Sequence, residues 1–228
     1  MTGTGAGRVA VVVPVYGNEP TLRPLTARLA AALEGRSWRL RLVIDASPDD
    51  SAATARVLAA EEPRVSVTEL PANVGQHRAL ARGLADEPSA DRWVCLDADL
   101  QDPPEAVPLL LDRLAGGDVG AVFAGRRGGY EPRLRRLTGT LHRRLAARLT
   151  GLPPDAGAFL AMDADVRRTV IEAVQAGAPS VVLAVAGAGR PVTSMPVVRD
   201  VRPEGESAWT GRARLRQSLQ SLYWALRR

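Results

Sequence analysis

The feature that most constrains the fold is an alternation of apolar, β-branched runs with segments of helical length. Five runs predict strands, at 8–15, 40–45, 65–70, 92–97 and 119–124. The segments between them predict helices, at 21–33, 52–60, 76–84 and 104–114. This alternation is typical of an α/β fold in which helices flank a Rossmann-like, mostly parallel sheet.

Polar residues gather where three of the predicted strands end. These clusters are Tyr16 to Glu19, Asp45 to Asp49 and Asp97 to Gln101. Ligands of open parallel sheets bind outside the carboxyl ends of the strands. The three clusters therefore predict a nucleotide cleft at that edge of the sheet.

Asp97 and Asp99 stand one residue apart after an apolar strand. Buried carboxylates without compensation are costly, so we expect the pair to meet solvent, a cation or a ligand. Mg²⁺ takes one or two carboxylates and completes its shell with phosphate oxygens and water. The pair predicts a metal-diphosphate site, whereas Asp102, just before Pro103 and Pro104, is expected to cap the next helix.

Composition bounds the number of domains and the class of partner. The chain has 228 residues and 46% apolar content, which predicts one compact domain at 8–208 after a flexible glycine-rich tail at 1–7. All 30 basic residues are arginine and the net charge is +5. The arginines concentrate at 126–148 and 199–228 with few aromatic residues for base stacking, so we expect no nucleic-acid partner. The lone Cys95 is expected to be an inert core thiol.

The pattern loosens after residue 125. We expect a basic helix at 133–149, a short strand at 156–162 and a helix at 166–176. Segment 209–228 predicts an amphipathic basic helix, with a stripe formed by Leu215, Leu219, Leu222 and Leu226. That stripe would suit docking on the domain, a membrane interface or a second subunit, and these alternatives stay open.

The cell compartment follows from what the sequence lacks. No stretch approaches the roughly 20 apolar residues of a membrane span, and the N-terminus lacks the layout of a signal peptide. We therefore expect a cytoplasmic protein, or one held peripherally on the inner face of the membrane through 209–228.

Six motifs together carry a resemblance that runs from about residue 8 to 225. They are Pro14-Val15-Tyr16-Gly17-Asn18-Glu19, Asn73-Val74-Gly75-Gln76-His77, Asp97-Ala98-Asp99-Leu100-Gln101, Gly125-Arg126, Asp155-Ala156-Gly157 and Arg202-Pro203-Glu204-Gly205-Glu206-Ser207. The chain resembles the family 2 glycosyltransferases of GT-A fold. Within them it is most similar to the branch that includes dolichyl-phosphate mannose synthases and undecaprenyl-phosphate aminoarabinose transferases.

The resemblance implies a role for each matching residue. Nucleoside binding would fall to Pro14, Tyr16, Glu19 and Asp45, with Asp97 at the same site. Asp97, Asp99 and Gln101 would hold Mg²⁺ or Mn²⁺ against the donor diphosphate. Phosphate binders for the donor or the acceptor would be Arg126, Arg135 and Arg202, with a hydroxyl contact from Ser207. Asp155 would be the base or acceptor-orienting carboxylate, so the candidate catalytic set is Asp155, Asp99, Arg126 and Arg202.

The implied single GT-A domain has a nucleotide and metal half at 8–125 and an acceptor half at 126–208. The implied activity is metal-dependent, inverting transfer of a sugar from a nucleotide-diphosphate sugar to polyprenyl phosphate. Two alternatives stay open: a soluble tailoring transferase acting on a small molecule or glycan, and a degenerate member that binds nucleotide without turnover. The departures from the family pattern are Ile44, Gly139, Ala161 and Ala208-Trp209.

Overall fold

A computed structural model describes residues 7–127 and 150–199, with only the backbone of Arg126 and Arg127. Several predictions fall outside these residues: most of the tail at 1–7, the basic helix at 133–149 and the amphipathic helix at 209–228. Within the described part no helix is long and apolar enough to cross a membrane.

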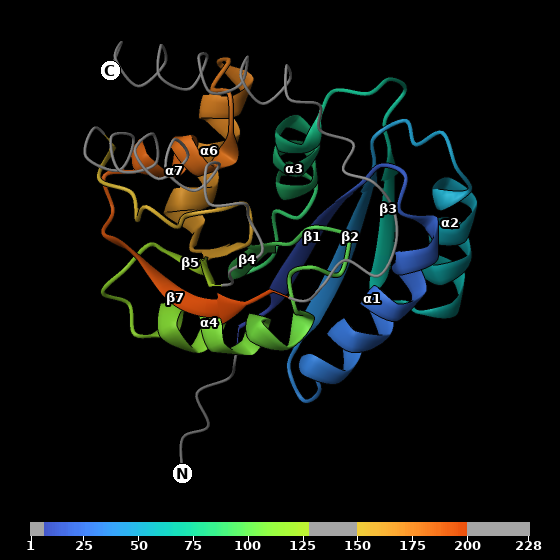
Figure 1. Ribbon diagram of the computed structural model, residues 1–228, viewed down its shortest axis with the longest axis horizontal. Coiled ribbons are helices and arrows are strands. Elements are labelled where there is room, and N and C mark those ends of the chain that lie inside the picture. Colours follow the sequence, from blue (N-terminus) through green and yellow to red (C-terminus); the bar gives the residue numbers. More distant parts are fainter. Residues whose placement is uncertain (1–6, 128–149, 200–228) are drawn as a thin grey trace, which may run out of the picture.

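Seven strands form one sheet, in the order β3-β2-β1-β4-β6-β5-β7 (Figure 1). Their bounds are β1 Val9–Val15, β2 Trp38–Ile44, β3 Val65–Glu69, β4 Arg92–Cys95, β5 Ala121–Arg127, β6 Leu160–Met162 and β7 Val192–Val198. Pairing is parallel except at β6, which runs antiparallel to both β4 and β5. The predicted mostly parallel α/β sheet is thus confirmed.

Helices cover both faces of the sheet. They are α1 Glu19–Ala32, α2 Ser51–Glu61, α3 Gln76–Ala85, the 3₁₀ turn η1 Pro104–Ala106, α4 Val107–Ala115, α6 Ala164–Gln175 and α7 Val181–Ala186. Residues from α1, α2, η1 and α4 pack in the core on one face, and residues from α3, α6 and α7 pack on the other (Figure 1). A sheet covered twice needs apolar side chains on both faces, which explains why the strands read as unbroken apolar runs.

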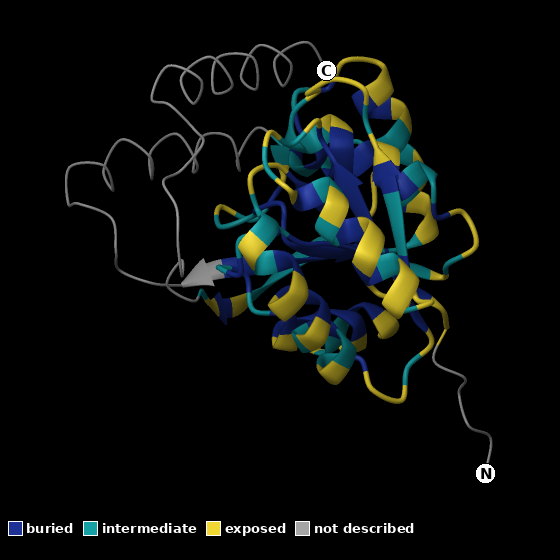
Figure 2. Ribbon diagram, turned by 90° about the vertical axis from the view of Figure 1, so that its right-hand side faces the viewer, coloured by how far each residue is buried: buried dark blue, intermediate teal, exposed yellow. Residues whose placement is uncertain are grey.

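Strand β1 shows how one strand serves both cores. Val11 and Val13 belong to the core on the α1 and α4 side, whereas Ala10 and Val12 belong to the core on the α3 and α6 side. All of β1 is buried, and exposed residues lie on the outer faces of the helices (Figure 2). Cys95 is also fully buried, which raises the pKa of its thiol, in agreement with the predicted inert role.

The topological switch point of the sheet lies at β1, because β2 and β3 lie on one side of this strand and β4 lies on the other. The ladder to β4 ends at Val12 and Cys95, whereas the ladder to β2 continues to Val15. The backbone of Pro14 faces the β4 side of β1, where pairing has already ended at Val12. The missing N–H of Pro14 therefore removes no hydrogen bond from the sheet. Beyond Val12 the two strands separate, and this is the point where open α/β sheets bind ligands.

Several element predictions need correction. The strand expected over 156–162 is formed only at Leu160–Met162. Two further elements, α7 and β7, were not anticipated. Ala161, where the family pattern has an arginine, is fully buried in β6 between β4 and β5, so a charged side chain there would be buried in the core.

Candidate active site

The backbone N–H groups of the loop between β1 and α1 all donate hydrogen bonds to side chains of the protein. The N–H of Tyr16 donates to Asn18 Oδ1, that of Gly17 to Ser47 Oγ, that of Asn18 to Ser51 Oγ and that of Glu19 to Asp49 Oδ2. Pro20 has no N–H. The start of α1 therefore offers no free N–H groups to a phosphate, unlike helix starts that bind diphosphates directly.

The hydrogen bonds from this loop to Ser47, Ser51 and Asp49 join it to the loop after β2 and the first residue of α2, and together they are called the latch. Asp49 is at its centre. Burial by itself would raise its pKa, but hydrogen bonds from Ser47, Ser51 and the Glu19 N–H lower it from 3.8 to about 2. Asp49 is therefore a carboxylate at neutral pH. The fold uses it to fix the loop, which is a role that the sequence did not indicate.

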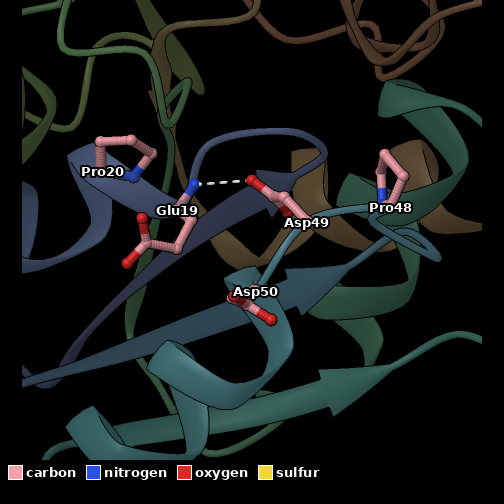
Figure 3. A pocket seen from close by; sticks show the side chains of 5 residues that line it. All are labelled: Glu19, Pro20, Pro48, Asp49 and Asp50. Carbon is pink, nitrogen blue, oxygen red and sulfur yellow. Dashed lines mark hydrogen bonds between the residues drawn. The ribbon is translucent and has the colours of Figure 1, made fainter.

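An open pocket of about 360 Å³ lies beside this latch (Figure 3). Its lining residues are Glu19, Pro20, Pro48, Asp49 and Asp50. Glu19 is positioned by Thr54, whose hydroxyl donates to Glu19 Oε1 at 3.1 Å. A lining with three carboxylates and no cation suits hydroxyl and N–H donors and disfavours phosphate.

Asp45 directly follows the last residue of β2 and is buried, with 3% of its surface exposed. Its two oxygens accept from the N–H groups of Val74 and Gly75, at 2.7 and 2.9 Å. Gly75 has a φ of +87°, a conformation that residues with a side chain rarely adopt. Asp45 thus fixes the loop that begins α3, and its predicted contact with the base would use the remaining lone pairs.

The acidic turn after β4, residues 97–102, receives support from α3. Gln76 Nε2 donates to Asp97 Oδ1 at 2.6 Å. Asp99 Oδ1 accepts from the Gln101 N–H at 3.1 Å, and Leu100 between them has a φ of +59°. Within the described residues the only other non-glycine residue with positive φ is Ala46, directly after Asp45. Such strained positions concentrate at functional sites.

Asp102 does not cap the helix after it, which corrects the sequence prediction. The helical turn η1 begins at Pro104 without a side-chain cap. Asp102 is 3% exposed and accepts at Oδ1 from Arg199 Nε, at 2.5 Å, while its Oδ2 has no hydrogen-bond partner among the described residues. Asp102 therefore makes a tertiary ion pair instead of a local cap.

Asp155 lies against the end of β5. A side chain at Gly125 would collide with the Asp155 carboxylate, so glycine is required there by close approach. Within the part of the chain that the structure describes, the Oδ1 atom of Asp155 is buried without a hydrogen-bond partner. An oxygen of this kind is costly unless a ligand or water supplies a donor.

The structure brings several predicted residues together at the carboxyl edge of β1, β2 and β4. Tyr16 is 43% exposed and Glu19 lines the pocket, while Pro14 is buried in β1. The Thr21 hydroxyl donates to the Ala98 carbonyl and so joins the first loop to the acidic turn. The nucleoside and metal candidates thus belong to one continuous set of strand-end loops.

Several predicted residues of the acceptor half lie outside the described part of the chain. Arg126 is described only through its backbone, which belongs to β5. The others are Arg135, Arg202 and Ser207, and the departures Gly139, Ala208 and Trp209 also lie outside the described residues. The roles assigned to them from the sequence stay predictions.

Two residues of the site were missed by the sequence reasoning, Gln76 and Arg199. Gln76 belongs to the Gly75-Gln76-His77 string, which indicated that the position matters but not that it would reach Asp97. Arg199 belongs to an arginine-rich segment and carried no signal of its own. Both contacts join residues far apart in the sequence, so only the tertiary structure shows them.

The ligand chemistry of the acidic turn fits a divalent ion. Among the described residues no group of three His, Cys, Asp or Glu gathers, so an ion would rely on Asp97, Asp99 and the amide oxygen of Gln101. These ligands are all oxygen, and both carboxylates are partly exposed. Mg²⁺ and Mn²⁺ prefer oxygen ligands and commonly take the remainder from phosphate and water.

Solved structures share this fold. A mannosyltransferase from Pyrobaculum calidifontis in complex with GDP-Man and Mn²⁺ matches with a TM-score of 0.70 and 20% identity, over 97% of this chain and 65% of that chain. Glucosyl-3-phosphoglycerate synthase from Mycobacterium tuberculosis in complex with Mn²⁺, UDP and phosphoglyceric acid matches with a TM-score of 0.66 and 21% identity, over 96% and 77%. At these identities the matches establish the fold.

Curated relatives are more similar in sequence. The undecaprenyl-phosphate 4-deoxy-4-formamido-L-arabinose transferase of Pseudomonas aeruginosa is 37% identical over 174 residues, which cover 74% of this chain and 49% of the relative. The protein of the same name from Shewanella sediminis is 38% identical over 149 residues, covering 63% and 44%. The chain thus spans about half the length of the curated relatives that it matches.

The sheet order and the helices on both of its faces are those of the GT-A fold. Residues 10–167, more than half of the chain, match the family described as glycosyl transferase family 2. The chain belongs to that family, which confirms the resemblance stated from the motifs.

Proposed function

We propose that this glycosyltransferase moves a sugar from a nucleotide-diphosphate sugar to polyprenyl phosphate, with inversion and with a bound Mg²⁺ or Mn²⁺. The observation that carries the proposal is the position of Asp97 and Asp99, in a strained turn at the point where β1 and β4 separate. The names of the two curated relatives reported above, which specify undecaprenyl phosphate, support the acceptor.

The two ends of the donor would be held by different chemistry. The acidic pocket at Glu19 and Asp50 suits the hydroxyl and N–H groups of a nucleoside. The diphosphate would bind at Asp97, Asp99 and Gln101, because the start of α1 has no free N–H groups for it. A divalent ion held there would stabilise the departing diphosphate by charge, a contribution typically worth several kcal/mol.

Transfer would proceed by in-line attack. An acceptor oxygen forms a bond to the anomeric carbon while the bond from that carbon to the diphosphate oxygen breaks. A phosphate acceptor is already an anion and needs no strong base, so the arginines would position it. For a hydroxyl acceptor, Asp155 would have to remove the proton. The arginines Arg126, Arg135 and Arg202, with Ser207, remain the proposed phosphate contacts.

The first experiment is a panel of nucleotide sugars with Mn²⁺ or Mg²⁺, with and without polyprenyl phosphate in detergent. We expect release of nucleoside diphosphate from one donor, with labelled sugar recovered on the lipid, and loss of both in Asp99→Asn. The control is Asp118→Asn, an exposed carboxylate that pairs with Arg113 after α4 and should leave the activity unchanged. Turnover without metal, or an Asp99→Asn variant as active as the wild type, would contradict the proposal.

Asp155→Asn distinguishes the two kinds of acceptor. With polyprenyl phosphate as acceptor we expect a loss below about tenfold, whereas general-base catalysis on a hydroxyl would lose about 10²- to 10⁴-fold. Transfer only to a soluble acceptor would replace the lipid in this proposal. Nucleotide binding without turnover of any donor would indicate a degenerate member.

A further inference from the structure

Arg199 directly follows β7 and yet lies against the acidic turn that follows β4. Strands β6 and β5 separate β4 from β7 in the sheet. The Nε of Arg199 donates to Asp102 Oδ1 at 2.5 Å, and its Nη2 lies 3.8 Å from Asp97 Oδ2. The Arg199 side chain is 22% exposed and that of Asp102 only 4%. A charge this buried is screened little by salt.

The two contacts of Arg199 differ in kind. The bond to Asp102 is a charge-assisted hydrogen bond, whereas 3.8 Å to Asp97 is too long for a hydrogen bond. Burial by itself would lower the pKa of Arg199, but the bond and charge of Asp102, together with the charges of Asp97 and Asp99, raise it. Arg199 therefore keeps its charge beside both proposed metal ligands.

A fixed cation beside a metal site opposes the binding of a second cation. Arg199 acts on Asp97 through charge alone, so its effect on a divalent ion at the turn is repulsive. A donor diphosphate brings negative charge and offsets that repulsion. Asp102 holds the guanidinium in place, and its other oxygen is buried and accepts no hydrogen bond from the described residues.

We propose that Arg199 is a positioning residue of the metal site which, held by Asp102, keeps the affinity of the acidic turn for a divalent ion low until the donor diphosphate binds. This inference rests on the proposed function, because it assumes the ion at Asp97 and Asp99. It predicts that the ion and the diphosphate enter together.

The test measures Mn²⁺ binding to the full chain by the electron paramagnetic resonance of free Mn²⁺, without donor and then with UDP or GDP. The main variant is Arg199→Gln with Asp102→Asn, which removes both charges and retains a possible hydrogen bond. We expect this double variant to bind Mn²⁺ alone about tenfold more tightly than the wild type. Asp102→Asn alone should bind Mn²⁺ more weakly, because Arg199 keeps its charge and loses its own anion.

The double variant should bind Mn²⁺ more tightly and Asp102→Asn more weakly, and this difference separates a role at the metal site from a role in folding. A double variant with the thermal midpoint of the wild type and no gain in Mn²⁺ affinity would overturn the inference. Should the double variant not fold, Asp102→Asn alone decides: unchanged or tighter Mn²⁺ binding overturns it. If the wild type binds no Mn²⁺ even with nucleoside diphosphate, the proposed metal site itself fails. If it binds Mn²⁺ and Asp99→Asn does not, but the Arg199 variants match the wild type, only this inference fails.

Discussion

At the scale of single residues, Asp45 has the most sharply defined role. Asparagine keeps its shape but places an N–H₂ group opposite a backbone N–H of Val74 or Gly75. We expect Asp45→Asn to lower the free energy of unfolding in urea by about 1–3 kcal/mol. The control, Asp50→Asn at an exposed position after the same strand, should change it by less than about 0.5 kcal/mol. Equal stabilities of the two variants would contradict this role.

His77 predicts a dependence of stability on pH. Its Nδ1 is buried and has no partner among residues 7–127 and 150–199, although the residue as a whole is partly exposed. Burial lowers the pKa of His77 from 6.5 to about 4. Between these values the unfolded chain takes up a proton that the folded chain does not, so stability falls as the pH falls through this range. The advantage of the wild type over His77→Gln should therefore shrink from pH 7 to pH 4. A constant difference, measured by urea unfolding at each pH, would contradict it.

The sequence predicted those site residues whose chemistry is local. Asp97 and Asp99 could be predicted as metal ligands because two carboxylates after a strand have few structural explanations. The prediction for Asp102 was wrong, because a carboxylate before two prolines resembles a helix cap. Its actual partner, Arg199, lies 97 residues away, so no nearby residue indicates the ion pair. The role of Asp49 was missed for the same reason, because its partner, the N–H of Glu19, lies 30 residues away in the sequence.

At the scale of elements, helix α3 packs unusually close to the sheet. A Cβ at Gly83 would collide with Val12 and lie 2.7 Å from a methyl group of Val43. Alanine favours the helix by about 1 kcal/mol, but overpacking typically costs about 1–3 kcal/mol. We expect Gly83→Ala to be destabilising by about 1 kcal/mol in urea unfolding, whereas Arg78→Ala on the exposed side of the same helix stays within about 0.5 kcal/mol. Stabilisation by Gly83→Ala would show that the interface has room.

The elements of the first half were predictable because apolar period and turn residues agree there. In the second half that agreement is lost. Helix α7 has only six residues and is wholly apolar, so it shows no helical period. Strand β7 contains Pro196 and has mostly half-buried residues, because it is an edge strand. Neither pattern distinguishes a strand or helix from a loop.

At the scale of the whole molecule, the order of the strands could not be read from the sequence. The strands of the first half suggest a sheet in which β4 and β5 are neighbours, but β6 lies between them and pairs with both. That insertion depends on a core shared by distant parts of the chain, to which Trp93, Phe123 and Leu160 all belong. The described parts of residues 8–125 and 126–208 therefore share one sheet and the cores on both of its faces.

This shared core predicts that residues 8–125 do not fold alone. Without β6, strands β4 and β5 lose their common neighbour, and Trp93 and Phe123 lose the cover of α6 and α7. We expect the 8–125 fragment to lack a cooperative urea transition and the near-ultraviolet circular dichroism of a buried tryptophan, whereas a chain of residues 8–199 regains both. A cooperative transition in the short fragment would mean that the first half is an independent domain to which the second half was added at β6.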